Sequence, residues 1–271
     1  MMRALYTAAT GMIAQQSNVD NISNNLSNVN TVGYKEQKTE FKSLLYQTIQ
    51  TRTTSANGEE KPISAQVGLG TRVAANTSIY TQGSMIASEN STDFAISGDG
   101  FFAVRGADGK TYYTRAGNFT WAVNGNAVRL TTTDGYPVLD TNGNEITLPA
   151  GVSSGQVIVS SDGSFGYTTA KGTYVDMNRS FGIYQFNNPA GLEKEGQNLL
   201  AETPASGAPL NEATNNNVTR SKIYQNYLEG SNVQVADEMV NLIVAQRAYQ
   251  LNSKAITASD EMLEQANNLR R

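Results

Sequence analysis

The sequence predicts an α+β protein: paired long N- and C-terminal helices, coiled-coil-like, with an inserted antiparallel all-β domain and an extended arm. Apolar residues recur at helical spacing near both ends of the 271-residue chain. Between the ends the apolar period changes to two, and Asn-Gly and Asp-Gly dipeptides separate the strand-like runs. We therefore expect four segments: an N-terminal helix (1–33), a linker and arm (34–93), a β domain (94–220) and a C-terminal helix (221–271).

The first helix is predicted by an apolar stripe at heptad positions and the positions between them, namely Leu5, Ala8, Met12, Val19, Ile22, Leu26 and Val29. Such a narrow stripe is typical of a helix that packs against other helices. We expect the helix to run from about residue 2 to residue 30, with Gly33 as a left-handed cap.

A row of asparagines runs beside this stripe, at Asn18, Asn21, Asn25 and Asn28. Asparagine is a poor helix former because its amide competes for nearby backbone groups. A solvated face is the simple alternative, but Glu, Lys and Gln are the commoner choices there. We favour hydrogen bonding between subunits.

The second helix is predicted by a matching apolar edge, formed by Ala236, Val240, Val244, Ala248, Leu251, Ala255, Ala258 and Met262. Ser231 with Gln234 fits a capping box, and Asp237 and Glu238 suit the positive end of the helix dipole. We assign to a subunit interface Leu5, Met12, Asn18, Val19, Asn21, Ile22, Asn25, Leu26, Asn28, Val29, Val240, Val244, Arg247, Ala248, Leu251, Ala255 and Met262.

The middle of the chain is mostly extended. We expect 34–50 to be extended and then helical, 51–66 to form a polar loop or flexible arm, and 67–86 to return as extended chain. The β domain begins near Phe94. Its predicted strands are Phe101–Arg105, Thr111–Arg115, Phe119–Val123, Ala127–Thr132, Gln156–Ser160 and Phe181–Phe186.

Composition limits the chemistry. The net charge is −4 with no basic block, which gives no sign of nucleic-acid binding. Without cysteine there is no disulfide or thiolate metal site, and without histidine the commonest general base and metal ligand are missing. We expect no enzymatic activity, cofactor or metal. The N-terminus has no continuous apolar core, so any export keeps it uncleaved.

Three motifs have simpler explanations than catalysis. The run Gly98–Ala103 matches a dinucleotide fingerprint, but a strand follows it where that motif needs a helix. The acidic pairs 59–60, 237–238 and 260–261 fall in a polar loop and on helices, so solvated faces and helix-dipole partners explain them better than acid–base work. Trp121 could stack on a sugar, but in a strand it is more often half-buried packing.

Several motifs together resemble the rod and hook axial proteins of the bacterial flagellum, most closely their distal-rod branch. They are the run from Asn21 to Lys35 (NISNNLSNVNTVGYK), ISGDGFF from Ile96, YTRAGNF from Tyr113, LEGSNV from Leu228 and QRAY from Gln246. The resemblance covers nearly the whole chain.

The resemblance implies a structural subunit of the basal-body distal rod, a hollow helical polymer that transmits motor torque to the hook and passes exported subunits. It implies a periplasmic rod location, reached through the flagellar type III export apparatus. The implied partners are further copies, proximal rod proteins, the hook protein and, where present, bushing ring proteins. The arm from about Gln47 to Gln66 is similar to a segment that reaches a neighbouring subunit.

Two other interpretations stay open. The first is a proximal rod or hook–basal-body paralogue, although the full-length β domain and the long arm favour the distal rod. The second is a stalked β-domain adhesin or glycan-binding module, which would need an exposed aromatic cleft and a self-sufficient coiled coil.

Overall fold

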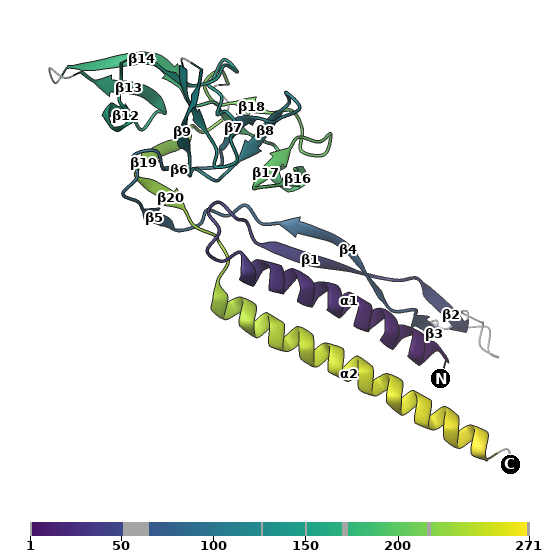
Figure 1. Ribbon diagram of the computed structural model, residues 1–271. Coiled ribbons are helices and arrows are strands. Elements are labelled where there is room, and N and C mark those ends of the chain that lie inside the picture. Colours follow the sequence, from purple (N-terminus) through teal and green to yellow (C-terminus); the bar gives the residue numbers. More distant parts are fainter. Residues whose placement is uncertain are drawn as a thin grey trace. The chain divides into compact units, whose positions relative to one another are not determined.

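The computed structural model describes residues 2–50, 65–125, 127–149, 151–169, 173–215 and 218–269 (Figure 1). The chain divides into two compact units. The helical unit comprises Met1–Ser27, Gln37–Ser78 and Gln234–Arg271, and the β unit comprises Asn28–Glu36 and Ile79–Val233. Helices at both ends of the chain, with antiparallel strands between them in sequence, confirm the predicted α+β class.

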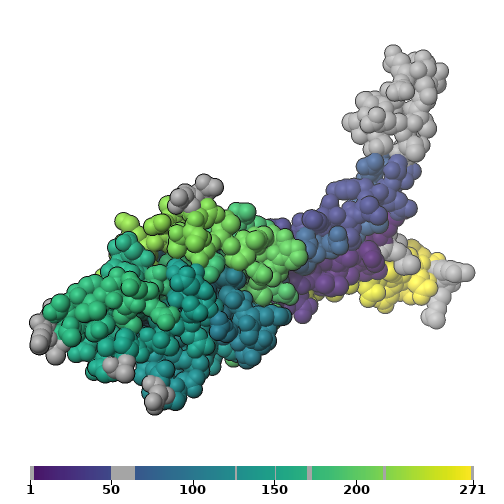
Figure 2. All heavy atoms as spheres, turned by 90° about the horizontal axis from the view of Figure 1, so that it is seen from above, coloured from purple at the N-terminus to yellow at the C-terminus, as the bar shows by residue number. Residues whose placement is uncertain are grey.

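The helical unit contains both helices and two strand pairs. Its elements are α1 (Met2–Ser27), β1 (Gln37–Ser43), β2 (Tyr46–Gln50), β3 (Ala65–Gly68), β4 (Thr71–Ser78) and α2 (Val235–Asn268). The strands β1 and β4 pair antiparallel, as do β2 and β3. The strands β1 and β4 lie along one side of α1 and α2 lies along another (Figure 1). The space-filling view shows the strands beside α1 and the far end of α2 (Figure 2).

Residues 34–50 are not helical in any part, so that expectation was wrong. The strands β1 and β2 occupy Gln37–Ser43 and Tyr46–Gln50. Thr39 is buried and bonded to α1, and β1 pairs with β4 along its whole length. Tertiary pairing therefore decides the conformation of a segment whose apolar spacing is ambiguous. Most of the predicted polar arm lies outside the described residues, between β2 and β3.

The helix ends differ slightly from expectation. α1 ends at Ser27, and Gly33 has φ +69, the predicted left-handed conformation, six residues later. The predicted capping box at Ser231 and Gln234 is wrong. α2 has Gln234 as its N-cap with no side-chain cap bond, and Ser231 Oγ instead accepts a bond from Val233 N. Asp237 and Glu238 do lie in the first turn, where the dipole favours them.

The two helices run antiparallel. Asn25 near the end of α1 bonds Glu238 at the start of α2, while Gly11 lies against Asn252. A methyl group on Gly11 would lie 2.8 Å from Asn252 Nδ2, so the helices approach closely there. The inner row of α2 consists of the buried or half-buried residues Glu238, Leu242, Ala245, Ala248, Asn252, Ile256, Ser259 and Leu263. Their spacing of three and four residues forms one face, which Glu238 and Asn252 place against α1.

The β unit is built from short antiparallel strands. They are β5 (Met85–Ala87), β6 (Phe94–Ser97), β7 (Phe101–Arg105), β8 (Thr111–Thr114), β9 (Thr120–Asn124), β10 (Ala127–Thr131), β11 (Thr147–Leu148), β12 (Val157–Val159), β13 (Ser164–Thr168), β14 (Tyr174–Ser180), β15 (Ile183–Gln185), β16 (Glu193–Gly196), β17 (Leu199–Ala201), β18 (Leu210–Asn211), β19 (Lys222–Gln225) and β20 (Tyr227–Glu229). Short 3-10 helices occupy Ser154–Gln156 and Pro189–Gly191.

The largest sheet has six strands in the order β16-β17-β8-β7-β15-β18. Three-stranded sheets β11-β10-β9 and β12-β13-β14 and the pairs β19-β6 and β20-β5 complete the unit. Phenylalanines dominate the core: the Phe94 ring packs edge-on against Phe181 at 5.0 Å and against Phe165 at 6.4 Å. Trp121 is half-buried against this core, as predicted.

The turn dipeptides behave as predicted. Gly109, Gly125, Gly135, Gly143 and Gly163 all have positive φ. These positions favour glycine because a Cβ would clash with the backbone there. Local chemistry therefore determines where the hairpins of the β unit turn. No described helix is long and apolar enough to cross a membrane.

Candidate assembly surface

The outer row of α2 lies roughly 120° around the helix from its inner row, measured between the centres of the two rows. We give this name to Val240, Val244, Arg247, Leu251, Ala255, Ala258 and Met262, most of the edge identified from the sequence together with Arg247. Val240 and Val244 stand two residues beyond Glu238 and Leu242, about 200° around the helix. The exposed fractions of Val240, Val244 and Leu251 are 59%, 61% and 67%.

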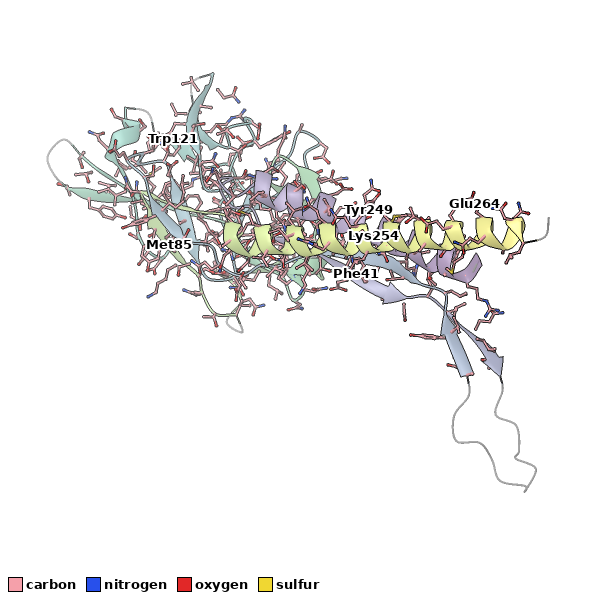
Figure 3. All side chains as sticks on the ribbon, turned by 90° about the horizontal axis from the view of Figure 1, so that it is seen from below. Phe41, Met85, Trp121, Tyr249, Lys254 and Glu264 are labelled. Atoms are coloured by element: carbon pink, nitrogen blue, oxygen red, sulfur yellow. The ribbon has the colours of Figure 1, made fainter. Side chains whose placement is uncertain are left out.

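Two neighbours widen this outer surface. Met239 and Ile243 are also more than half exposed. Tyr249, Lys254 and Glu264 project from α2 with exposed side chains (Figure 3). α2 thus carries apolar side chains on two separate faces, and α1 of the same chain covers one of them. A surface helix of an isolated protein normally needs a single apolar face.

α1 also keeps apolar side chains partly open. The stripe residues Leu5, Met12, Val19 and Leu26 are half-buried, and Ile22 is buried. Beside them Tyr6 and Ile13, one heptad apart, are 59% and 67% exposed. The helical unit therefore presents apolar surface on both helices. Of the other predicted interface residues, Ala248 is half-buried, Arg247, Ala255 and Met262 are exposed, and Asn28 and Val29 fall in the β unit.

The asparagine row has a role within the chain that sequence reasoning missed. Asn25 is 1% exposed, and its Oδ1 accepts a bond from Gln37 N while its Nδ2 donates to Gln37 O. The same Nδ2 lies 3.3 Å from Glu238 Oε1. Asn25 therefore joins α1, β1 and the first turn of α2. Its side-chain amide pairs with the strand backbone as a neighbouring strand would.

Two other members of the row are also engaged, and the fourth, Asn18, is half-buried. Asn21 is buried and its Nδ2 donates to Thr39 Oγ1 at 2.9 Å. Asn28 Oδ1 accepts a bond from Thr31 Oγ1. These bonds within the chain explain why asparagines, which are poor helix formers, stand at three of these positions. No local sequence signal links Asn25 to Gln37, so sequence reasoning could not find this contact. The assignment of the row to a subunit interface stays a prediction.

Polar groups in the β unit are tied to one another. Glu212 Oε1 accepts bonds from Gln185 Nε2 and Ser221 Oγ, and its Oε2 accepts one from Ser221 N. A small pocket of about 90 Å³ borders this group, lined also by Asp162 and Arg220. Among the described residues no group of acidic side chains is arranged to hold a metal ion.

Comparison with known proteins now decides the family. Residues 5–35 match the family described as "Flagella basal body rod protein". Residues 95–167 match "Flagellar hook protein FlgE/F/G D1 domain", and residues 224–269 match "Flagellar basal body rod FlgEFG protein C-terminal". The "Flagellar basal-body rod protein FlgG" of Borreliella burgdorferi is 43% identical over 272 residues, which cover 100% of both chains. The chain belongs to the flagellar basal-body rod protein family.

Further relatives agree. The FlgG protein of Agrobacterium fabrum is 43% identical and covers 96% of this chain and 97% of its own. That of Bacillus subtilis is 38% identical over the full length of both chains. The "Flagellar hook-basal body complex protein FlhP" of Bacillus subtilis is 33% identical over the full length of both. This rod subunit is therefore a structural protein of the flagellar basal body, assembled there with other flagellar proteins.

The family matches coincide with the assembly surface. The N-terminal match spans most of α1 and extends to Lys35, and the C-terminal match contains β20 and α2. The distal-rod resemblance read from the sequence motifs is confirmed by these full-length FlgG relatives.

Proposed function

We propose that this rod subunit polymerises into the hollow distal rod, which transmits motor torque to the hook and lets exported subunits pass. One observation carries the proposal: α2 has apolar side chains on two separate faces, and the described part of the chain covers only one of them. Burial of an exposed valine or leucine stabilises an assembly by about 1.5–3 kcal/mol per side chain. Val240, Val244 and Leu251 on one face therefore provide a substantial driving force for association.

The contact is proposed to be heterologous. The outer row of α2 is left exposed by α1 of its own chain, so we propose that it packs on another copy. Tyr6 and Ile13 on α1 offer an apolar surface for it, with Leu5 and Met12 beside them. A head-to-tail contact between different surfaces that does not close produces a helical polymer.

We propose one role in the polymer for each segment expected from the sequence. Residues 1–33 and 221–271 would form the polymer core, 94–220 the outer β domain and 34–93 the arm. The strands β2 and β3 pair at the base of the arm, and Leu45 and Tyr46 are exposed there. We propose that the arm reaches a neighbouring copy.

The remaining partners follow from the rod assignment. We propose contacts with proximal rod proteins, the hook protein and, where present, bushing ring proteins, and export through the flagellar type III apparatus without cleavage. We also propose that the chain has no enzymatic activity, because the carboxylate of Glu212 beside the small pocket accepts hydrogen bonds from its own chain.

A related position in the basal body is the second candidate. The match to FlhP, a hook–basal body complex protein, favours considering a paralogous rod position. Crosslinking in isolated basal bodies separates the two, because a distal subunit is expected to crosslink to the hook protein. The stalked binding module is disfavoured, because a self-sufficient pair of helices would not expose the apolar outer row of α2 to solvent.

Polymerisation tests the proposal directly. Purified chain carrying Val244→Asp is compared with Gln246→Asp, which places the same charge on an exposed site two residues away, about 200° around α2. Polymer is measured by sedimentation and electron microscopy.

Val244→Asp is expected to abolish polymer while the monomer keeps its helical circular dichroism, because Val244 is exposed within the chain. Gln246→Asp is expected to polymerise as wild type does. Normal polymers from Val244→Asp would refute the outer row as the interface.

A further inference from the structure

The helical unit and the β unit are joined by four chain crossings. The chain passes between them at 27–28, 36–37, 78–79 and 233–234. On the β-unit side, three segments carry these crossings: 28–36, the chain that follows residue 79, and the chain that ends at residue 233. Every covalent path between the units therefore runs through these three segments.

Glu229 joins the three segments within the β unit. It is 0% exposed, and its Oε1 accepts bonds from Lys35 Nζ at 2.6 Å and Gly83 N at 3.0 Å. Its backbone carbonyl accepts a bond from Gly33 N at 2.8 Å. Its Oε2 pairs with Arg115 Nη1 at 3.2 Å, which ties the group to the turn after β8.

A second residue repeats the connection. Asn232 Oδ1 accepts a bond from Glu36 N at 2.7 Å. Its Nδ2 donates to Ile79 O and to Thr81 Oγ1, both at 2.9 Å. Lys35 Nζ also donates to Thr81 O. The same three segments are thus held together twice, by a carboxylate and by an amide.

Close backbone contacts show how tightly these segments pack. A Cβ on Gly83 would lie 2.0 Å from Gly230 O. A Cβ on Gly33 would lie 2.6 Å from Ala116 N, and φ there is +69. Glycine is needed at both positions, because no side chain fits between the backbones.

The charges in this group are unusual. Two buried cations, Lys35 and Arg115, face one buried carboxylate, and Asp99 and Glu212 add attraction from farther away. Burial lowers the pKa of both Lys35 and Arg115. A buried ion group of this kind often adds little net stability compared with apolar packing, yet removing one partner is strongly unfavourable. Geometry is therefore a better explanation for it than stability.

We propose that Glu229 and Asn232 are positioning residues that hold the three segments carrying the four crossings in one fixed arrangement. We call this arrangement the root of the β unit. Because these segments do not move relative to one another, torque passes through them without loss. The proposal rests on the proposed role of the chain as a torque-transmitting rod. It adds that the shaft's stiffness depends on this root as well as on contacts between subunits.

Glu229→Gln tests the root in the purified full chain. Asp140→Asn is the matched control. Asp140 is also buried, pairs with Arg179 at 3.1 Å and accepts bonds from two backbone amides, but its carboxylate bonds none of the three segments that carry the crossings. Hydrogen exchange is measured at Gly33 and Gly83. We expect exchange at both to rise at least about tenfold in Glu229→Gln, because local opening becomes easier. We expect no change there in Asp140→Asn.

A second variant guards against general unfolding. Asn232→Ala leaves the ion group intact and removes only the amide ties, so we expect it to accelerate the same two exchanges. Unfolding of the β unit is followed through the fluorescence of Trp121. Unchanged amide hydrogen exchange at Gly33 and Gly83 in both variants would overturn the proposal that Glu229 and Asn232 hold these segments together.

Function is tested in the source bacterium lacking its own copy of the gene. We expect the Glu229→Gln and Asn232→Ala chains to assemble rods, hooks and filaments but to lose swimming in viscous medium, where load is high. Asp140→Asn cells are expected to swim as wild type does. Wild-type swimming under load by both root variants would refute the inference and leave the proposed function intact. Failure of the wild-type chain itself to polymerise would refute the proposed function instead.

Discussion

Removing the Phe94 ring is expected to destabilise the β unit selectively. Phe94 is 1% exposed and packs among the rings of Phe119, Phe165 and Phe181 at 5.0–6.4 Å. Phe94→Ala leaves a cavity among aromatic side chains that are themselves fixed by the sheets. Such a site collapses poorly, so we expect a loss of about 3–5 kcal/mol.

Urea unfolding of the monomer measures this loss. Trp121 is the only tryptophan of the chain and packs against the same core, so its fluorescence reports the β unit. With a denaturant slope of about 2 kcal/mol/M, the midpoint should fall by about 1.5–2.5 M. Val123→Ala is the control, because Val123 is 76% exposed and its truncation should change stability by less than about 0.5 kcal/mol.

The helical circular dichroism should change little in Phe94→Ala, because both long helices belong to the other unit. A fluorescence midpoint within about 0.5 M of wild type would refute the packed aromatic core. Equal loss of the helical signal would show that the two units unfold as one.

Four further outcomes are expected. Asn25→Ala should lower the stability of the helical unit by about 2–3 kcal/mol, because the backbone groups of Gln37 lose their partner. Thermal circular dichroism compares this variant with Ser23→Ala, a substitution at an exposed site. Equal melting temperatures of the two variants would count against the prediction. Burial raises the pKa of Tyr113, so its contribution to the stability of the β unit is full below about pH 10, and it falls at higher pH, where the unfolded chain loses the proton first. Tyr113→Phe should reduce this loss of stability in urea titrations between pH 9 and 11. An unchanged dependence of stability on pH would contradict the prediction. Leu26→Asp should block polymerisation and leave the fluorescence transition of the β unit unchanged. Assembly of normal rods by this variant would contradict the prediction. Deletion of 51–66 should keep the subunit soluble and change rod stiffness or length, which electron microscopy of isolated rods would reveal or rule out.

Local rules were enough for much of the fold. The Asn-Gly and Asp-Gly dipeptides placed the hairpin turns, since a positive φ depends on the residue at that position. The long apolar periods placed both helices, and the strand setting of Trp121 predicted its half-buried state. For the turns and for the helix periods, the determining interaction lies within a few residues along the chain.

Non-local contacts decided what the sequence did not reveal. Lys35 and Glu229 lie 194 positions apart, so no spacing rule connects them. The strands in 34–50 depend on β4 and α1 for their conformation, which overrides a weak local preference. The sequence revealed the apolar outer row of α2. It did not reveal the inner row, which packs against α1 and thereby leaves the outer row exposed. Only the packed helix pair separates the two faces.

The hairpin tip at Asp134 and Gly135 offers a practical consequence for imaging. Gly135 has φ +89, and a Cβ there would meet nothing within 4 Å. The tip belongs to the β unit, whereas both long helices belong to the other. A short epitope tag inserted here would label each subunit of an assembled rod without altering either helix. Fusions at the chain ends would not have this advantage, because both ends belong to the helical unit.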